Sequence, residues 1–308
     1  MGGSSGTFRT GHSPTRVAED IQRIASEQAA AFDATLAKEF SRLLSQFNSR
    51  NTQETAERLE AIKVALLEKI DGSFDTLFGG SVAKHTFVDG LSDVDSMLLI
   101  SGRFAEANPS AMLNNIAETL NASLGVGVEV SHGPVAVTVK YPDGNEIQLV
   151  PCLGREGGRL KVPAWDSNTW SNIDPRQFRE GLTKRNDQCG GKLIPTLKLA
   201  KAVNSTLPEN ARLSGYHIES IGVAAFRGYE GEKTTVRMLP HFFRRASDLV
   251  LAPMADRTGQ SVHVDEHLGS AESPQRQALS HALARIHQRM VNASAAGSSD
   301  RWMEILGE

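Results

Sequence analysis

The sequence is poor in cysteine and long apolar runs, and it has little net charge. Cys152 and Cys189 are its only cysteines, too few for a disulfide framework or for a structural zinc site built mainly of thiolates. It has no run of about 18 apolar residues and no apolar signal core near its start, so we expect a cytoplasmic protein with no membrane partner. A net charge of −3 argues against the overall basic footprint of a nucleic-acid binder.

The remaining composition and the periodicity predict a globular α+β fold. Apolar residues make up 40% and charged residues 22% of the chain, which is ordinary for globular proteins. Apolar steps of three and four residues predict long N-terminal helices up to residue 71, β-branched runs between 94 and 151 predict strands, and helical patterns resume near 175. We expect a flexible N-terminus at 1–13, a core with long N-terminal helices at 14–170, a helical lobe at 171–293 and a tail at 294–308.

The most informative segment, residues 79–95, places a Gly-Ser turn ahead of two carboxylates. Asp93 and Asp95 are one residue apart and precede an apolar run, so the period of two predicts both on one face of a buried strand. Two adjacent carboxylates suit Mg²⁺, and they repel each other unless a cation lies between them. Gly80 and Ser81 can bring backbone N–H groups and a hydroxyl close to a phosphate. Turn and strand together predict a site for a metal-bound nucleoside triphosphate.

This pattern resembles the signature of the DNA polymerase β-like nucleotidyltransferase superfamily. Within it, residues 80–86 and 92–95 are similar to the cGAS/DncV-like nucleotidyltransferases, which make cyclic oligonucleotide signals in bacterial anti-phage defence (CBASS). Weaker similarities follow at residues 146–151, 197–204, 216–219 and 256–261. The resemblance implies a polymerase β-like core, with a mixed sheet and helices, packed against a mainly helical C-terminal lobe.

The resemblance also implies the activity. It is the joining of ATP, GTP or other nucleoside triphosphates into a cyclic di- or trinucleotide second messenger, with Mg²⁺ or Mn²⁺ as cofactor and pyrophosphate as by-product. A downstream effector that senses the product and CBASS accessory proteins are the implied partners. Zinc-based DNA sensing is excluded, since two cysteines cannot build the zinc insertion of the animal cyclic GMP-AMP synthases. A template-independent synthase of linear oligonucleotides remains an alternative.

In this family the carboxylate pair and the turn hold metal and phosphates. Asp93 and Asp95 are therefore our candidates for bridging two metal ions. Gly80 and Ser81 are candidates for contacting the β- or γ-phosphate. Lys84 can neutralise the same phosphate, although a surface lysine fits this position equally well.

Further nucleotide contacts are expected from the second half of the chain. Lys198 and Lys201 are three residues apart, a spacing that lets both ammonium groups on one helix face reach one triphosphate; the alternative is a pair of exposed lysines. Tyr216 can stack on a nucleobase. His217 and Glu219 fit a catalytic role or simply the polar start of a helix capped by Ser214.

The third carboxylate of the family is missing from its expected position. Measured from Val150 and Pro151, that acid falls at Gln148, a neutral residue and a poorer Mg²⁺ ligand. Glu146 lies two residues earlier and on the same strand face. Three interpretations stay open: Glu146 replaces the acid, two carboxylates with Gln148 and water suffice, or the protein is a catalytically impaired nucleotide-binding regulator.

Overall fold

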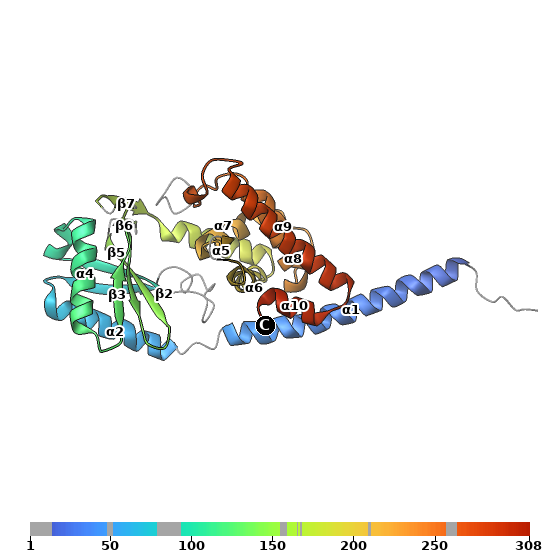
Figure 1. The fold of residues 1–308 in the computed structure, drawn as a ribbon, viewed down its shortest axis with the longest axis horizontal. Helices are drawn as coiled ribbons and strands as arrows, with labels where there is room; N and C mark the ends of the chain where they lie inside the picture. The colour runs from blue at the N-terminus through green and yellow to red at the C-terminus, as the bar shows by residue number, and fades with distance from the viewer. Residues whose placement is uncertain are drawn as a thin grey trace, which may run out of the picture.

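Two lobes make up the protein, a sheet lobe and a helical lobe (Figure 1). The computed structural model describes residues 14–47, 52–78, 94–154, 159–164, 166, 168–208, 211–256 and 264–308. No helix in these ranges combines the length and apolar character needed to cross a bilayer.

The strands form one mixed sheet, as the sequence predicts. Its members within the described ranges are β1 (Ser73–Phe78), β2 (Val94–Ser101), β3 (Glu129–His132), β4 (Val137–Lys140), β5 (Glu146–Gly154), β6 (Leu160–Pro163) and β7 (Trp170–Ile173). The central order is β1-β2-β5-β4-β3, with β6 joined to β5 and β7 to β6. β2 and β5 run parallel, whereas the other described pairs are antiparallel. The α+β fold class is thereby confirmed.

Helices α2 (Thr52–Lys69) and α4 (Pro109–Ser123) pack against one face of the sheet. Leu98 of β2 with Ile147 and Leu149 of β5 belong to this buried layer. The alternate residues Met97 and Val150 lie in a separate, smaller cluster with Cys152. This alternation is the period of two expected for a strand that separates two environments, so the sheet has one face filled by helices and another that holds the even-numbered positions of β5.

The helical lobe contains α5 (Pro175–Gln188), α6 (Leu193–Ser205), α7 (Gly215–Ala225), α8 (Thr235–Leu249), α9 (Pro274–Ala295) and α10 (Ser299–Leu306). Several of these helices begin where a Ser, Thr or Asp side chain accepts a hydrogen bond from a first-turn amide. The capping residues include Asp174, Ser214, Thr234, Ser273 and Ser298. Short polar sequence signals thus set the starts of these helices, and their apolar faces form one common core.

The long first helix, α1 (Pro14–Phe47), belongs partly to this helical core. Leu36, Phe40 and Leu43 are fully buried there, and Trp302 of α10 meets Phe40 edge-on with ring centroids 5.5 Å apart. The N-terminal half of α1 extends away from the lobe (Figure 1), and its Ile21 is 62% exposed. The lobe is therefore assembled from both ends of the described chain.

Candidate active site

The centre of the candidate site is the parallel pairing of β2 with β5. Asp95 of β2 lies opposite Gln148 of β5, with Val94 opposite Ile147. On its other side Gln148 lies opposite Thr138 of β4. The strand that carries Asp95 is thus the direct neighbour of the strand that carries the position of the third acid.

Four of the expected site residues lie outside the described residues. They are Gly80, Ser81, Lys84 and Asp93. For Asp95 the structure gives the position along β2 and its register. The roles of these five residues stay predictions from the sequence.

Glu146 lies at the start of β5, two residues before Gln148 and therefore on the same face of the strand. It is opposite Lys140 of β4, and its Oε1 lies 3.9 Å from Lys140 Nζ. The Glu146 side chain is 31% exposed and that of Lys140 52%, so solvent screens this long ion pair and it contributes little to stability. The carboxylate can accordingly exchange Lys140 for another cation at small cost.

The turn that leads into β5 is fastened to α2 by Arg58. Its guanidinium lies 4.1 Å from the centre of the Tyr141 ring and donates to Asp143 Oδ2 over 2.8 Å. The Asp143 carboxylate also accepts from Asn145 Nδ2 at 2.6 Å, and the pKa of Asp143 is lowered, first by Arg58 and then by Asn145. Asp143 is thus a turn residue, as its sequence context indicates, and Arg58, 85 positions earlier, carries no local signal for this role.

The two lysines of α6 occupy different environments. Lys201 is 6% exposed, and its Nζ lies 3.0 Å from Oε1 of Glu219 of α7, which is 1% exposed. The Lys201 ammonium fits beside Gly215, where a Cβ would lie 3.5 Å from Nζ. Lys198 is half-buried, and its pKa is lowered by burial and then by the charge of Lys201. Both cations therefore lie close together, one held by a buried carboxylate and one nearer the surface.

Tyr216 stands at the first turn of α7, held at two points. Its hydroxyl donates to Asp256 Oδ1 over 2.6 Å, and its ring meets Phe178 of α5 edge-on with centroids 4.8 Å apart. Ser214 caps the helix by accepting from the amide of His217, as the sequence suggests. The Asp256 contact, which joins residues 40 positions apart, was not visible in the sequence.

His217 is fully buried beside a charged pair. Its Nε2 lies 3.5 Å from Asp265 Oδ2, and Asp265 is bound at 2.6 Å by Arg276 Nη1. Burial lowers the pKa of His217 to about 4, against the opposing effect of Asp265. The imidazole is therefore neutral at pH 7, which suits a structural position in the lobe.

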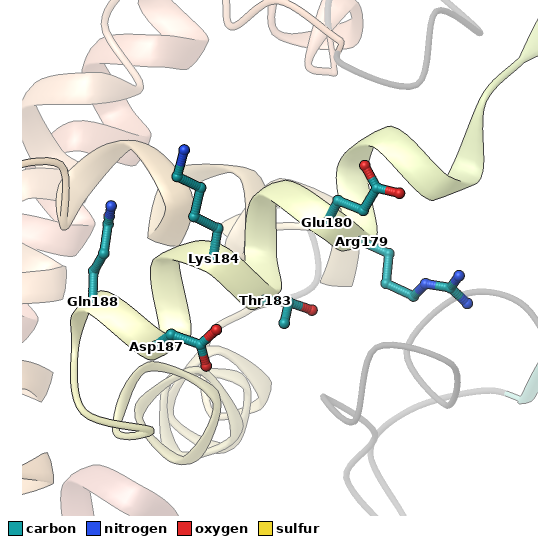
Figure 2. Close-up of a pocket in the computed structure, with 6 residues that line it drawn as sticks. All are labelled: Arg179, Glu180, Thr183, Lys184, Asp187 and Gln188. Atoms are coloured by element: carbon teal, nitrogen blue, oxygen red, sulfur yellow. The ribbon is translucent and has the colours of Figure 1, made fainter.

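The exposed face of α5 carries mixed charge around an open depression (Figure 2). It is lined by Arg179, Glu180, Thr183, Lys184, Asp187 and Gln188. In Figure 2 Lys184 and Gln188 extend to one side of the helix, and Asp187 extends to the other. Positive charge in this part of the chain is thus divided between a solvated helix face and the buried Lys201 of α6.

The donor set near β2 and β5 fits a hard divalent cation only in part. Asp95 and Glu146 are carboxylate residues and Gln148 has an amide oxygen, all ligand types that Mg²⁺ accepts. Among the described residues no group of three His, Cys, Asp or Glu side chains is gathered closely enough to hold a metal ion. With Asp93 outside those residues, the fit rests on ligand chemistry and on the register of Asp95 with Gln148.

Comparison with known families finds a match over residues 34–186, which include the whole described sheet. Residues 34–186 match the model of the Second Messenger Oligonucleotide or Dinucleotide Synthetase domain. A search of curated proteins finds no match. The resemblance predicted from the sequence is confirmed.

Solved structures share the fold at low sequence identity. CdnC of E. coli MS115-1, solved with ATP, aligns with a TM-score of 0.64 and 17% identity over 92% of this chain and 97% of its own. CdnG of Bradyrhizobium diazoefficiens, in complex with GTP, gives 0.63 and 14% over 82% and 88%. The Vibrio cholerae cyclic AMP-GMP synthase DncV, with a linear intermediate, gives 0.58 and 11% over 93% and 88%. The polymerase β-like architecture with a helical second lobe is thus confirmed.

Proposed function

Because the chain belongs to the cGAS/DncV-like nucleotidyltransferases, we propose that it joins nucleoside triphosphates into a cyclic di- or trinucleotide second messenger. One observation supports this most: Asp95 lies opposite the third-acid position, Gln148, across a parallel pair of strands. Such a neighbourhood would gather oxygen ligands from two strands at one point. The relatives solved with ATP and GTP add support for triphosphate substrates.

The reaction is nucleotidyl transfer. A ribose hydroxyl oxygen of one nucleotide attacks the α-phosphorus of another; the bond between that phosphorus and the bridging oxygen breaks, pyrophosphate leaves, and the hydroxyl proton passes to a base or to water. A last transfer within the linear di- or trinucleotide, in which its free hydroxyl attacks the α-phosphorus at its triphosphate end and pyrophosphate leaves again, closes the ring. Bound divalent cations would neutralise charge that develops on the phosphates.

The chain's own residues bind and orient the reactants. Asp93, Asp95 and Glu146 would hold the cations, and Gln148 would contribute its amide oxygen or a hydrogen bond to bound nucleotide. Gly80, Ser81 and Lys84 would bind the triphosphate. In the helical lobe, Lys198 and Lys201 would contact the triphosphate and Tyr216 would offer a stacking surface for a base.

A biological setting follows from the family. We propose anti-phage signalling in the bacterial cytoplasm, with an effector that senses the product. E. coli CdnC has also been solved as a complex with HORMA, which supports accessory proteins as further partners.

The test is product formation. Purified protein with Mg²⁺ or Mn²⁺ and labelled nucleotides should give a phosphatase-resistant product, and the Asp93→Asn and Asp95→Asn variants should give none while they keep the wild-type Tm. Phosphatase-sensitive chains would instead identify a linear oligonucleotide synthase.

A second candidate is favoured by Gln148 itself. If the neutral side chain leaves the metal site short of charge, the protein is a nucleotide-binding regulator. Tight triphosphate binding without turnover under either metal would identify this case.

A further inference from the structure

One arginine of the helical lobe is completely buried. Arg276, in the first turn of α9, has no exposed surface, and neither has Asp265, whose Oδ2 accepts from Arg276 Nη1 at 2.6 Å. The guanidinium also donates to the carbonyls of Val250, Ala252, Gly269 and Ser270 over 3.0 to 3.3 Å. A buried guanidinium must be paired and hydrogen-bonded. Here its partners are the Asp265 carboxylate and backbone carbonyls from two segments, 250–252 and 269–270.

Asp265 continues the network toward residues 250–256. Its Oδ1 accepts from the amide of Met254 at 3.0 Å, while the Met254 carbonyl accepts from the amide of Val264 at 2.8 Å. Residues 250–256 are thus held by Arg276 at two backbone carbonyls and by Asp265 at the Met254 amide. A loop held at so many backbone atoms has little freedom to change course.

Residues 250–256 meet the candidate site at Asp256. Two residues after Met254, Asp256 accepts from the Tyr216 hydroxyl at 2.6 Å, and the Tyr216 ring rests against Phe178. The next residue of α7, His217, has its Nε2 3.5 Å from Asp265 Oδ2, the oxygen that Arg276 also binds. The buried pair therefore lies one loop segment away from the aromatic ring that our proposed function assigns to a nucleobase.

We propose that Arg276 and Asp265 are positioning residues of the nucleotide site. They fix residues 250–256 so that Asp256 holds the Tyr216 hydroxyl and sets the plane of the ring before a base arrives. A side chain ordered in advance loses less freedom on binding, which tightens the complex. This inference rests on the proposed function, because it takes Tyr216 as the base contact.

The first test observes the ring directly. The chain has three tyrosines, so fluorotyrosine labelling gives a simple ¹⁹F spectrum in which Tyr216→Phe assigns the Tyr216 signal. Arg276→Lys, which keeps the charge but loses the planar fork, should shift or broaden that signal and leave the signal of Tyr141, in the sheet lobe, unchanged. Arg289→Lys is the matched control, since Arg289 is exposed on the same helix.

The second test measures nucleotide affinity. At a temperature well below each variant's Tm, Arg276→Lys should weaken ATP or GTP binding, or raise KM, by about 3- to 10-fold, as should Asp256→Asn. In a Tyr216→Phe background, which already lacks the hydroxyl, Arg276→Lys should add less than about 2-fold.

The outcomes separate the two proposals. Wild-type protein that binds nucleotide, together with an Arg276→Lys variant that has a lower Tm but an unchanged Tyr216 signal and unchanged affinity, overturns the positioning role alone. Effects that multiply fully in the double variant also overturn it. Absence of ATP and GTP binding by the wild-type protein overturns both.

Discussion

Lys201 of α6 and Glu219 of α7 form an ion pair almost entirely removed from water, with Nζ 3.0 Å from Oε1. Each charge offsets the other, since an unpaired ion in a protein interior carries a large desolvation penalty. The pair joins two helices of the lobe, and its ammonium lies against Gly215, the residue before Tyr216. A Lys201 variant can therefore lose activity simply because it is less stable, and its folding has to be measured together with its activity.

The ion pair predicts unequal effects of single and double substitutions. Lys201→Met should lower the free energy of unfolding by about 3–5 kcal/mol because it leaves the Glu219 carboxylate buried without its cation. The double variant Lys201→Met with Glu219→Gln should regain most of that loss. Chemical denaturation measures both. A double variant as unstable as the single one would contradict the pairing argument.

The same double variant isolates the role of Lys201 in nucleotide binding. If Lys201 contacts the triphosphate, the folded double variant should bind ATP or GTP more weakly than wild type, as measured by calorimetry. Lys198→Gln is the comparison, because Lys198 is half-buried and its replacement leaves the Lys201–Glu219 pair intact. Wild-type affinity in the double variant would remove Lys201 from the site.

Substitutions at Glu146 and Gln148 separate the three interpretations of the metal site. If Glu146 completes it, Glu146→Gln should lower the rate of product formation at least about 10-fold, since a carboxylate ligand is lost. Glu129→Gln is the matched control, because Glu129 of β3 also lies opposite Lys140 and should have no effect.

The other two interpretations give different results. If two carboxylates suffice, Glu146→Gln should leave the rate unchanged. If the protein is impaired, wild type should be nearly inactive and Gln148→Asp should raise its rate. Single-turnover assays with labelled nucleotide measure all three cases.

His217 predicts a loss of stability in mild acid. Its pKa is lowered to about 4 in the folded protein, against an ordinary value near 6.5 in the unfolded chain. Between these values the unfolded state binds more protons, so stability falls as pH decreases from about 6.5 to 4, by up to about 3 kcal/mol. Above pH 7 this contribution is fully present.

Denaturation as a function of pH checks this expectation. His217→Gln should flatten the slope in that window, leaving a smaller part due to His241, whose pKa burial also lowers. The charged groups that face His217 are Asp265, His267 and Arg276. His281→Gln, an exposed change on α9, should keep the wild-type slope; an unchanged slope in His217→Gln would contradict the assignment.

Trp302 predicts that α10 stabilises the lobe. Trp302→Ala should lower the free energy of unfolding by about 3–5 kcal/mol, because it opens a cavity in a fully buried site. It also removes the contact with Phe40 and the hydrogen bond to Ser294 Oγ. Trp302→Phe should lose much less. Urea denaturation gives both values, and an Ala variant as stable as wild type would show that α10 is dispensable.

Local sequence signals predicted much of the fold. Apolar steps predicted helices up to residue 71 and again from about 175, close to the observed end of α2 at Lys69 and start of α5 at Pro175, and the cap at Ser214 is present at α7. Each of these signals acts over one or two helical turns, a scale at which sequence and structure agree.

What the sequence did not predict depends on distant pairing. β6 and β7 have four residues each and pair with each other, too short for a visible period. Lys201 and Lys198 look equivalent on one helix face, and only the approach of Glu219 from α7 distinguishes them. Arg276 likewise resembles any helical arginine until loops 250–252 and 265–270 close around it.

The path of α1 also has a consequence for biosynthesis. Leu36, Phe40 and Leu43 emerge from the ribosome early, yet the helices that cover them, α6, α8 and α10, are translated only after the entire sheet. Until then the apolar stripe of α1 stays uncovered, a state that favours aggregation or chaperone binding in larger proteins. The helical lobe can therefore close only after α10 has been translated, more than 250 residues after the apolar stripe of α1 that it covers.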